Sequence, residues 1–337
     1  MSFMLALPKI SLHGAGAIGD MVNLVANKQW GKALIVTDGQ LVKMGLLDSL
    51  FTALDAHQMS YHLFDDVFPN PTEALVQKGF AAYQDAECDY VMAFGGGSPI
   101  DTAKAIKILT ANPGPSTAYS GVGKVKNPGV PLVAINTTAG TAAATGMDAL
   151  THAIEAYVSV GAHPLTDANA LEAIRLIALW LPKAVDDGHS LEAREQMAFG
   201  QYLAGMAFNS AGLGLVHALA HQPGATHNLP HGVCNAILLP VIENFNRPTA
   251  VARFARVAQA MGVETRGMSD EAASMSAIQA IRDLSARVGI PSGFSQLGVT
   301  KADIEGWLDK ALADPCAPCN PRTASRDDLR ELYLEAL

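Results

Sequence analysis

Short apolar runs alternate with helix-like segments in the first part of the chain, a pattern expected for strands buried between helices. Each run is rich in aliphatic or aromatic residues, and polar or turn-forming residues stand between the runs. The four runs cover residues 32–38, 60–64, 89–94 and 130–136. Because strands that alternate with helices form parallel sheets, this pattern predicts a Rossmann-like α/β domain.

From about Ala144 onward the apolar residues recur at helical spacing, and strand-like signals nearly disappear. We therefore expect an α/β domain over residues 1–143 and an all-α domain over residues 144–337. The length of 337 residues, 49% of them hydrophobic, is sufficient for two buried cores. The predicted helices of the second domain cover 147–158, 165–182, 191–224, 231–246, 250–262 and 270–288.

Charge and targeting signals narrow the range of partners. The net charge of −9 makes the surface repel nucleic acid and anionic lipid, so we expect neither a nucleic-acid partner nor a membrane partner. No apolar run reaches the ~18 residues that span a bilayer. The N-terminal residues lack the basic region of a signal peptide. These features predict a cytoplasmic protein.

The four cysteines are too few for a disulfide scaffold. Cys316 and Cys319 form a C-x-x-C pair, a spacing found in redox and zinc sites. The pair has no second pair to complete a zinc site, and no thioredoxin-like strand precedes it. This context favours two cysteines in a Pro-rich turn.

A glycine-rich segment, Gly95-Gly96-Gly97-Ser98, joins the third apolar run to a helix. Glycines let backbone N–H groups approach a pyrophosphate, and the helix N-terminus adds partial positive charge. Ser98 and Asp101 have the spacing of a capping box. The segment is neither G-x-G-x-x-G nor a Walker loop, so a phosphate site and a ligand-free turn are both open.

Asp38 ends the first apolar run, where a carboxylate can bind an adenosine ribose and favour NAD over NADP. In the standard fingerprint the acidic residue follows the glycine loop, whereas Asp38 precedes it. Spacing alone therefore favours a turn role for Asp38.

One aspartate and four histidines form the strongest chemical signal. Asp148 and His152 are four residues apart, as are His217 and His221, which puts each pair on one helix face. His231 follows ten residues later and is predicted to open the next helix. Unpaired ionisable groups in apolar helices are unfavourable, and a shared divalent metal removes the penalty. Aspartate with histidines suits Fe²⁺, and Zn²⁺ and Mn²⁺ are alternatives.

Five segments occur in a fixed order along the chain, at residues 95–104, 137–141, 146–155, 217–224 and 228–232. Together they resemble the iron-dependent (group III) alcohol dehydrogenases. The resemblance runs nearly end to end. It is closest to the branch that contains lactaldehyde reductases (1,2-propanediol oxidoreductases) and ethanol or 1,3-propanediol dehydrogenases.

The resemblance implies a dehydroquinate synthase-like fold, with an N-terminal domain that binds NAD and a helical C-terminal domain that holds the metal. It implies an NAD-dependent enzyme that interconverts short primary alcohols or diols with aldehydes by hydride transfer, as a homodimer or larger homo-oligomer. The implied metal ligands are Asp148, His152, His217 and His231, with His221 as a pocket and proton-relay residue. The implied dinucleotide contacts are Asp38, Asn70, Gly96, Gly97, Ser98, Asp101, Thr137 and Thr138.

The chain departs from the family pattern at one place. Relatives carry on the order of forty additional residues, several strands' worth, between residues 141 and 146. Either this segment is missing from the printed sequence or the protein has lost it, and the close match on both sides favours the first explanation. A true loss would endanger NAD binding, while the metal site could survive.

Three other functions fit parts of the sequence. A maleylacetate reductase-like enzyme would share the fold, but that group tends to lack the full set of one aspartate and three histidines. A metal-dependent hydrolase or lyase would have no use for residues 95–98 and Asp38, and the glutamate of an H-E-x-x-H protease is absent. An inactive nucleotide-binding protein would follow from a true internal loss.

Overall fold

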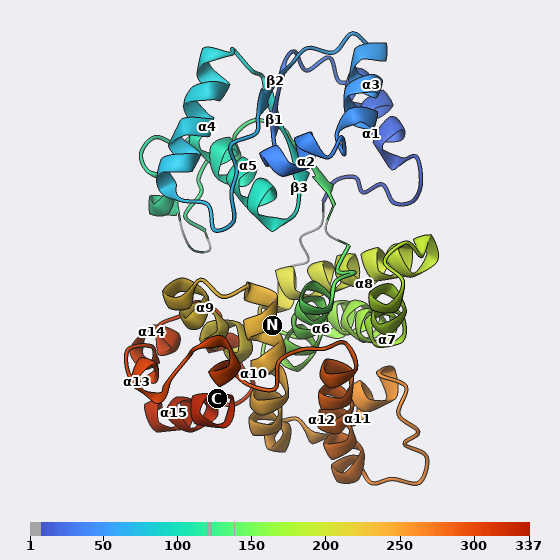
Figure 1. Ribbon diagram of the computed structural model, residues 1–337, viewed down its shortest axis with the longest axis vertical. Helices are drawn as coiled ribbons and strands as arrows, with labels where there is room; N and C mark the ends of the chain where they lie inside the picture. The colour runs from blue at the N-terminus through green and yellow to red at the C-terminus, as the bar shows by residue number, and fades with distance from the viewer. Residues whose placement is uncertain (1–7, 120, 122, 138) are drawn as a thin grey trace. The chain divides into compact units, whose positions relative to one another are not determined.

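The computed structural model describes residues 8–119, 121, 123–137 and 139–337 (Figure 1). The chain divides into two compact units, and each is described by itself. One unit is Lys9–Thr138, and the other consists chiefly of the residues from Ala139 to Leu337.

The first unit is built on a four-stranded sheet in the order β2-β1-β3-β4, with all neighbouring strands parallel. The predicted parallel sheet is therefore confirmed, with each strand within two residues of its expected position. The strands are β1 (Ala33–Val36), β2 (Tyr61–Phe64), β3 (Tyr90–Gly95) and β4 (Leu132–Asn136).

Helices cover both faces of this sheet (Figure 1). Ala33 and Ile35 of β1 pack toward α1 and α3, whereas Leu34 and Val36 pack toward α4 and α5. Burial on both faces explains why the strands are continuous apolar runs. The helical elements of this unit are α1 (Ala17–Ala26), α2 (Gly39–Lys43), α3 (Asp48–Ala56), α4 (Glu73–Asp85), α5 (Gly97–Leu109) and the 3₁₀ turn η1 (Ser116–Tyr119).

The glycine-rich segment forms the turn from β3 to α5, but Ser98 does not cap the helix as predicted. The helix starts at Gly97 with Gly96 as its N-cap, and no side chain caps it. Gly95 adopts φ +145°, which turns the chain into the helix before Ser98 is reached. Ser98 therefore lies within the first turn, where its carbonyl accepts a hydrogen bond from Thr102 Oγ1 at 2.8 Å.

The second unit is helical in the part that the structure describes, and α6 lies in its core, packed against α7, α8 and α10. The helices are α6 (Ala143–Val158), α7 (Pro164–Asp186), α8 (Leu191–Ala211), α9 (Leu215–His227), α10 (His231–Asn246), α11 (Val251–Ala260), α12 (Asp270–Arg287), α13 (Lys301–Ile304), α14 (Leu308–Leu312) and α15 (Arg326–Glu335). Short 3₁₀ turns are η2 (Arg247–Thr249), η3 (Phe294–Leu297) and η4 (Ala317–Cys319).

The single helix predicted over 191–224 is wrong, because the chain bends by 105° between α8 and α9. Gly212 ends α8 with φ +79°, and Gly214 passes close to two side chains. A Cβ at Gly214 would lie 2.8 Å from Asn320 Oδ1 and 3.0 Å from Glu155 Oε1. Apolar spacing continues through the bend, so periodicity did not reveal it. Among the described residues no single helix has the length and apolarity to cross a bilayer, and α8 with α9 meets that test only as a bent pair.

Candidate metal centre

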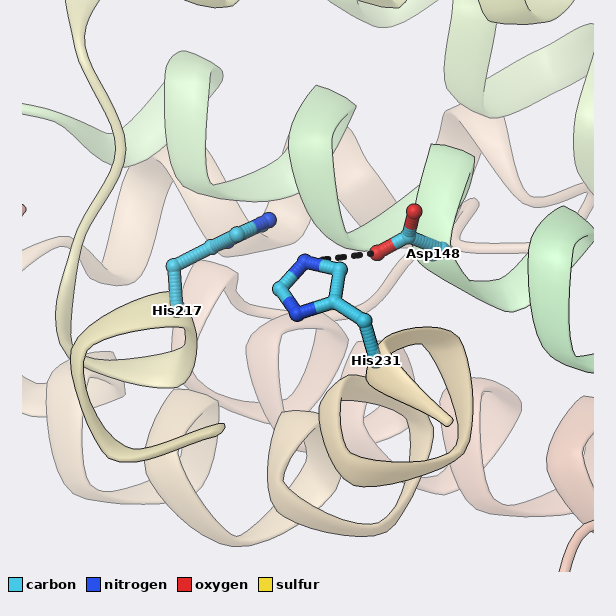
Figure 2. A group of neighbouring side chains, drawn as sticks. All are labelled: Asp148, His217 and His231. Carbon is cyan, nitrogen blue, oxygen red and sulfur yellow. Dashed lines mark ion pairs between the residues drawn. The ribbon is translucent and has the colours of Figure 1, made fainter. Parts of the chain in front are cut away.

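Three helices of the second unit direct polar side chains toward one point. Asp148 lies on α6, His217 in the first turn of α9, and His231 at the first position of α10. Their nearest ligand atoms all lie within 4.8 Å of one another. Figure 2 shows the three side chains pointing toward a common point from separate helices, with His231 Nε2 3.6 Å from Asp148 Oδ1.

The close approach of α6 and α10 depends on a glycine beside His231. A Cβ at Gly232 would lie 2.5 Å from the carbonyl oxygen of Ala144 and 3.3 Å from the Cβ of Asp148. Only glycine fits this contact without movement of the backbone. Gly232 therefore allows His231 and Asp148 to meet.

His152 is the fourth predicted ligand, and its ring contacts that of His217. The two Nε2 atoms of His152 and His217 are 3.1 Å apart. The Nδ1 atom of His152 lies 2.8 Å from the carbonyl oxygen of Asp148, one helical turn earlier. This carbonyl can only accept, so His152 carries its proton on Nδ1 and leaves Nε2 as a lone pair.

The same reasoning applies to His217, whose Nδ1 contacts Oε2 of Glu155. When Glu155 is a carboxylate, His217 donates to it from Nδ1, and Nε2 of His217 then carries a lone pair. Two Nε2 lone pairs then face each other at 3.1 Å inside the protein. Such an arrangement is repulsive unless a positive charge lies between or beside them, and a metal cation supplies that charge.

Asn235, one helical turn after His231, also lies among these side chains, and it was not predicted from the sequence. Its amide nitrogen lies 2.6 Å from Asp148 Oδ1 and 2.9 Å from His231 Nε2. The same nitrogen is 3.2 Å from His217 Nε2, and the buried Asn235 Oδ1 has no hydrogen-bond partner among the described residues. Asp148 Oδ1, His217 Nε2 and His231 Nε2 therefore all face the NH₂ group of Asn235. The four-residue spacing from His231 was the signal that could have revealed Asn235.

The protonation states fit divalent metal binding. Burial raises the pKa of Asp148, but His152, His231 and His217 outweigh it and hold the pKa below its usual value. Burial lowers the pKa of His217 well below its usual range, and it also lowers that of His231. A charged aspartate with neutral imidazoles is the form that binds a divalent cation, so the oxygen and nitrogen donors present here fit iron or zinc.

His221 occupies a different position from the other histidines. Its ring stacks against that of His231, with centroids 5.5 Å apart, and its side chain is 42% exposed. Its Nδ1 lies 2.8 Å from Oδ2 of Asp314, which is 10% exposed and comes from the segment after α14. Asp314 is far away in sequence and belongs to no recognised motif, so nothing in the pattern identified it.

Glu155 is a second buried acid that the sequence did not single out. It lies on the same face of α6 as Asp148 and His152, and its side chain is 1% exposed. Burial raises its pKa to about 7, although hydrogen bonds from the backbone of the α9 N-terminus oppose the shift. Through Oε2 it contacts Nδ1 of His217, one of the three side chains of the metal centre.

The residues predicted to bind the dinucleotide lie in the first unit, mostly at the carboxyl ends of its strands. Asp38 follows β1, while Gly96 and Gly97 follow β3. Asp38 Oδ1 accepts hydrogen bonds from the backbone of Gln40 and Leu41 at 3.0 Å, so it caps α2. In the order β2-β1-β3-β4 the connections diverge between β1 and β3, which is where open α/β sheets bind ligands.

The remaining predicted contacts surround this edge. Thr137 follows β4, and its backbone N–H donates to the carbonyl oxygen of Gly95 at 3.0 Å. Ser98 and Asp101 lie in the first turns of α5, and Asp101 Oδ1 pairs with Lys104 Nζ at 3.1 Å. Asn70 lies between β2 and α4 with φ +57°. Thr138 lies outside the described residues.

Two family descriptions match the chain. "Iron-containing alcohol dehydrogenase" matches residues 8–154, and "Fe-containing alcohol dehydrogenase family, C-terminal" matches residues 142–337. The chain belongs to the iron-containing alcohol dehydrogenase family. The predicted family, fold and enzyme class are therefore confirmed.

Several named relatives of this family are similar over their full length. The NAD-dependent methanol dehydrogenase of Bacillus methanolicus is 38% identical, with 98% of this chain and 99% of that protein covered. The lactaldehyde reductase of Escherichia coli (strain K12) is 39% identical, with 99% of both covered. A crystal structure of 1,3-propanediol oxidoreductase is 38% identical, with a TM-score of 0.97 and 100% of both chains covered.

Membership of the iron-containing alcohol dehydrogenases makes the chain an NAD-linked oxidoreductase that interconverts alcohols and aldehydes. It removes the support for a metal-dependent hydrolase or lyase. The alignment with the methanol dehydrogenase runs over 376 positions, more than the 337 residues of this chain. That relative therefore carries residues that have no counterpart here.

Proposed function

We propose that this iron-containing alcohol dehydrogenase family member acts on short primary alcohols or diols and the corresponding aldehydes. The observation that carries the proposal is the convergence of Asp148, His217 and His231 within 4.8 Å of one another, on three helices of one unit. The named relatives that act on methanol, lactaldehyde and 1,3-propanediol support a small substrate.

In this proposal Asp148, His152, His217 and His231 hold Fe²⁺, with Zn²⁺ as an alternative that the same donor set suits. When bound, the metal supplies Lewis acidity at the substrate oxygen, and NAD accepts or returns the hydride. The intact set of one aspartate and three histidines favours this reaction over that of a maleylacetate reductase-like enzyme.

The protein's own part in the reaction is to orient groups and carry a proton. His221 is 42% exposed and stacks on His231, so it can exchange a proton between the site and water. Asp314 accepts a hydrogen bond from Nδ1 of His221, which directs the other ring nitrogen, Nε2, away from Asp314 and leaves it free to take up the alcohol proton.

We further propose that the dinucleotide binds at the carboxyl edge of the sheet in the first unit. The N–H groups of Gly96, Gly97 and Ser98 at the start of α5 suit a pyrophosphate. Asp38 uses Oδ1 to cap α2, which leaves Oδ2 for ribose hydroxyls. The other proposed contacts are Asn70, Asp101, Thr137 and Thr138. Assembly as a homodimer or larger homo-oligomer and residence in the cytoplasm stay predictions from the sequence.

The deciding experiment follows NADH oxidation by protein that is produced without oxygen and loaded with Fe²⁺ or Zn²⁺. A series of short aldehydes serves as substrate, and His217→Ala is compared with His57→Ala, which changes an exposed histidine of the first unit. We expect metal-dependent turnover in wild type and His57→Ala, and none in His217→Ala. Absence of turnover with both metals in the wild type would contradict the proposal.

A further inference from the structure

Glu155 receives hydrogen bonds from a helix other than its own. Its Oε1 accepts from the backbone N–H of Val216 at 2.7 Å, and Oε2 contacts Nδ1 of His217. The backbone of Gly214 donates to it as well. The N-cap of α9 is Gly214, which has no side chain of its own to serve the first N–H groups. Glu155 thus caps α9 from α6, where a carboxylate is favoured by the helix dipole.

The backbone neighbours of Glu155 are N–H donors, and its Oε2 faces Nδ1 of His217, so the form of Glu155 decides where the proton of His217 lies. The hydrogen bonds from the backbone of Gly214 and Val216 favour the carboxylate form of Glu155 and oppose the effect of burial, which raises its pKa. A carboxylate only accepts, so His217 donates from Nδ1 and its Nε2 carries a lone pair. That lone pair is the one that faces His152 and Asn235, at 3.1 and 3.2 Å.

We propose that Glu155 is a positioning residue that fixes the tautomer of His217, so that Nε2 of His217 is always available to a metal ion. The proposal rests on the proposed role of His217 as a ligand. Glu155 then has two roles. Its carboxylate caps the first turn of α9, and it determines which ring nitrogen of His217 carries the proton. Asp148, His152 and Glu155, at successive turns of α6, then form one functional face of that helix.

Glu155→Gln separates these two tasks, because an amide has one acceptor where the carboxylate has two. If the amide oxygen stays with the backbone N–H of Val216, the NH₂ group faces Nδ1 of His217 and donates to it. The histidine proton then moves to Nε2, and the nitrogen can no longer bind a metal. Loss of such a partner typically weakens metal affinity about 10- to 100-fold.

Glu243→Gln is the matched control. Glu243 is also a fully buried glutamate of the helical unit, on α10, and its Oε2 accepts from Nδ2 of Asn246 at 3.0 Å. It contacts none of the proposed ligands in the hydrogen bonds and ion pairs of the described residues. A general effect of removing a buried acid from this unit therefore appears in both variants, whereas the direct contact with His217 is lost only in Glu155→Gln.

The first measurement is the tautomer of His217 in full-length, metal-free protein with ¹⁵N-labelled histidine, by long-range ¹H–¹⁵N correlation. The signal is assigned by its absence in His217→Gln. We expect the proton on Nδ1 in wild type and Glu243→Gln, and on Nε2 in Glu155→Gln. A wild-type proton on Nε2 overturns the proposal, and this result does not require Glu155→Gln to fold.

The second measurement is Zn²⁺ affinity by competition with a chelator. We expect a dissociation constant about 10- to 100-fold higher in Glu155→Gln and less than about threefold changed in Glu243→Gln. Equal affinities for Glu155→Gln and wild type overturn the positioning role. If the wild type binds no Zn²⁺ through His217, the proposed metal function fails instead, while the tautomer still reports on Glu155.

Discussion

Asp314 Oδ2 lies 2.8 Å from Nδ1 of His221, although the two residues are ninety-three positions apart and belong to different elements. Asp314 is nearly buried, whereas His221 is partly exposed beside His231. A carboxylate behind an accessible imidazole accepts a hydrogen bond from Nδ1 and so orients the ring. This relationship gives the proposed proton relay a partner that can be tested.

Asp314→Asn is expected to lower kcat about tenfold or more, because proton transfer through a positioned histidine contributes at least that much. Metal content and the dissociation constant for NADH should stay at wild-type values. Among the described residues, no hydrogen bond or ion pair joins Asp314 to a proposed metal ligand or to a proposed dinucleotide contact. Steady-state kinetics with a solvent isotope comparison measure the effect. Asp309→Asn, at an exposed aspartate that pairs with Arg326, is the control. A kcat equal to that of wild type would show that Asp314 does not serve the relay.

Gly214→Ala tests the bend that presents His217. An added Cβ would lie 2.8 Å from Asn320 Oδ1 and 3.0 Å from Glu155 Oε1, so one of these side chains must move. We expect a loss of about 1–3 kcal/mol in the free energy of unfolding, as for other overpacked sites, together with weaker Zn²⁺ binding.

The matched variant is Gly205→Ala, on α8, where no atom lies within 4 Å of the added Cβ. A helical glycine in open space gains about 0.5–1 kcal/mol when it becomes alanine, so this variant should be more stable than wild type. Denaturant unfolding measures both. Equal stability of the two variants would mean that the contact at Gly214 is not tight.

The positions of the four strands and of most helices along the chain followed from the sequence, because apolar periodicity records which faces are buried. Ile35 and Val36 pack against helices on opposite faces of the sheet, so both positions are apolar in the sequence. The bend after Gly212 was missed since helical spacing resumes on both sides of it. His217 and His231 were recognisable from their spacing. Glu155, Asn235 and Asp314 act through contacts that form only on folding. Of these three, only Asn235 has a signal in the sequence, its four-residue spacing from His231.

The segment between residues 141 and 146 gives a prediction about the protein as it occurs in its source. Between Lys126 and Arg175 the sequence contains no other lysine or arginine, so trypsin should release residues 127–175 as one peptide. If relatives' additional segment is merely missing from the printed sequence, mass spectrometry of the natural protein will not find this peptide, and its intact mass will exceed that of 337 residues. Detection of the peptide would establish a true loss, and NADH affinity would then become the decisive measurement.

The buried carboxyl group of Glu243 makes the stability of the helical unit depend on pH. Burial raises its pKa from 4.5 to about 8, and the nearby Glu155 adds to the shift. Its Oε1 has no hydrogen-bond partner in the described part of the chain. A carboxyl group with a raised folded-state pKa binds its proton more tightly in the folded protein than in the unfolded chain. Its contribution to stability is therefore fully present below about pH 4.5 and is lost as the pH rises through about 8.

Glu243→Gln keeps the shape of the side chain and removes this titration, so its advantage over wild type should grow between pH 5 and pH 8, by up to about 1.4 kcal/mol per pH unit. Thermal unfolding of metal-free protein at a series of pH values measures the difference in Tm. Glu192→Gln, on the exposed surface of α8, should follow the wild-type curve. A Tm difference between Glu243→Gln and wild type that stays constant over this range would show that Glu243 does not titrate there. A growing difference would identify the buried Glu243 carboxyl as a source of alkaline instability in the helical unit.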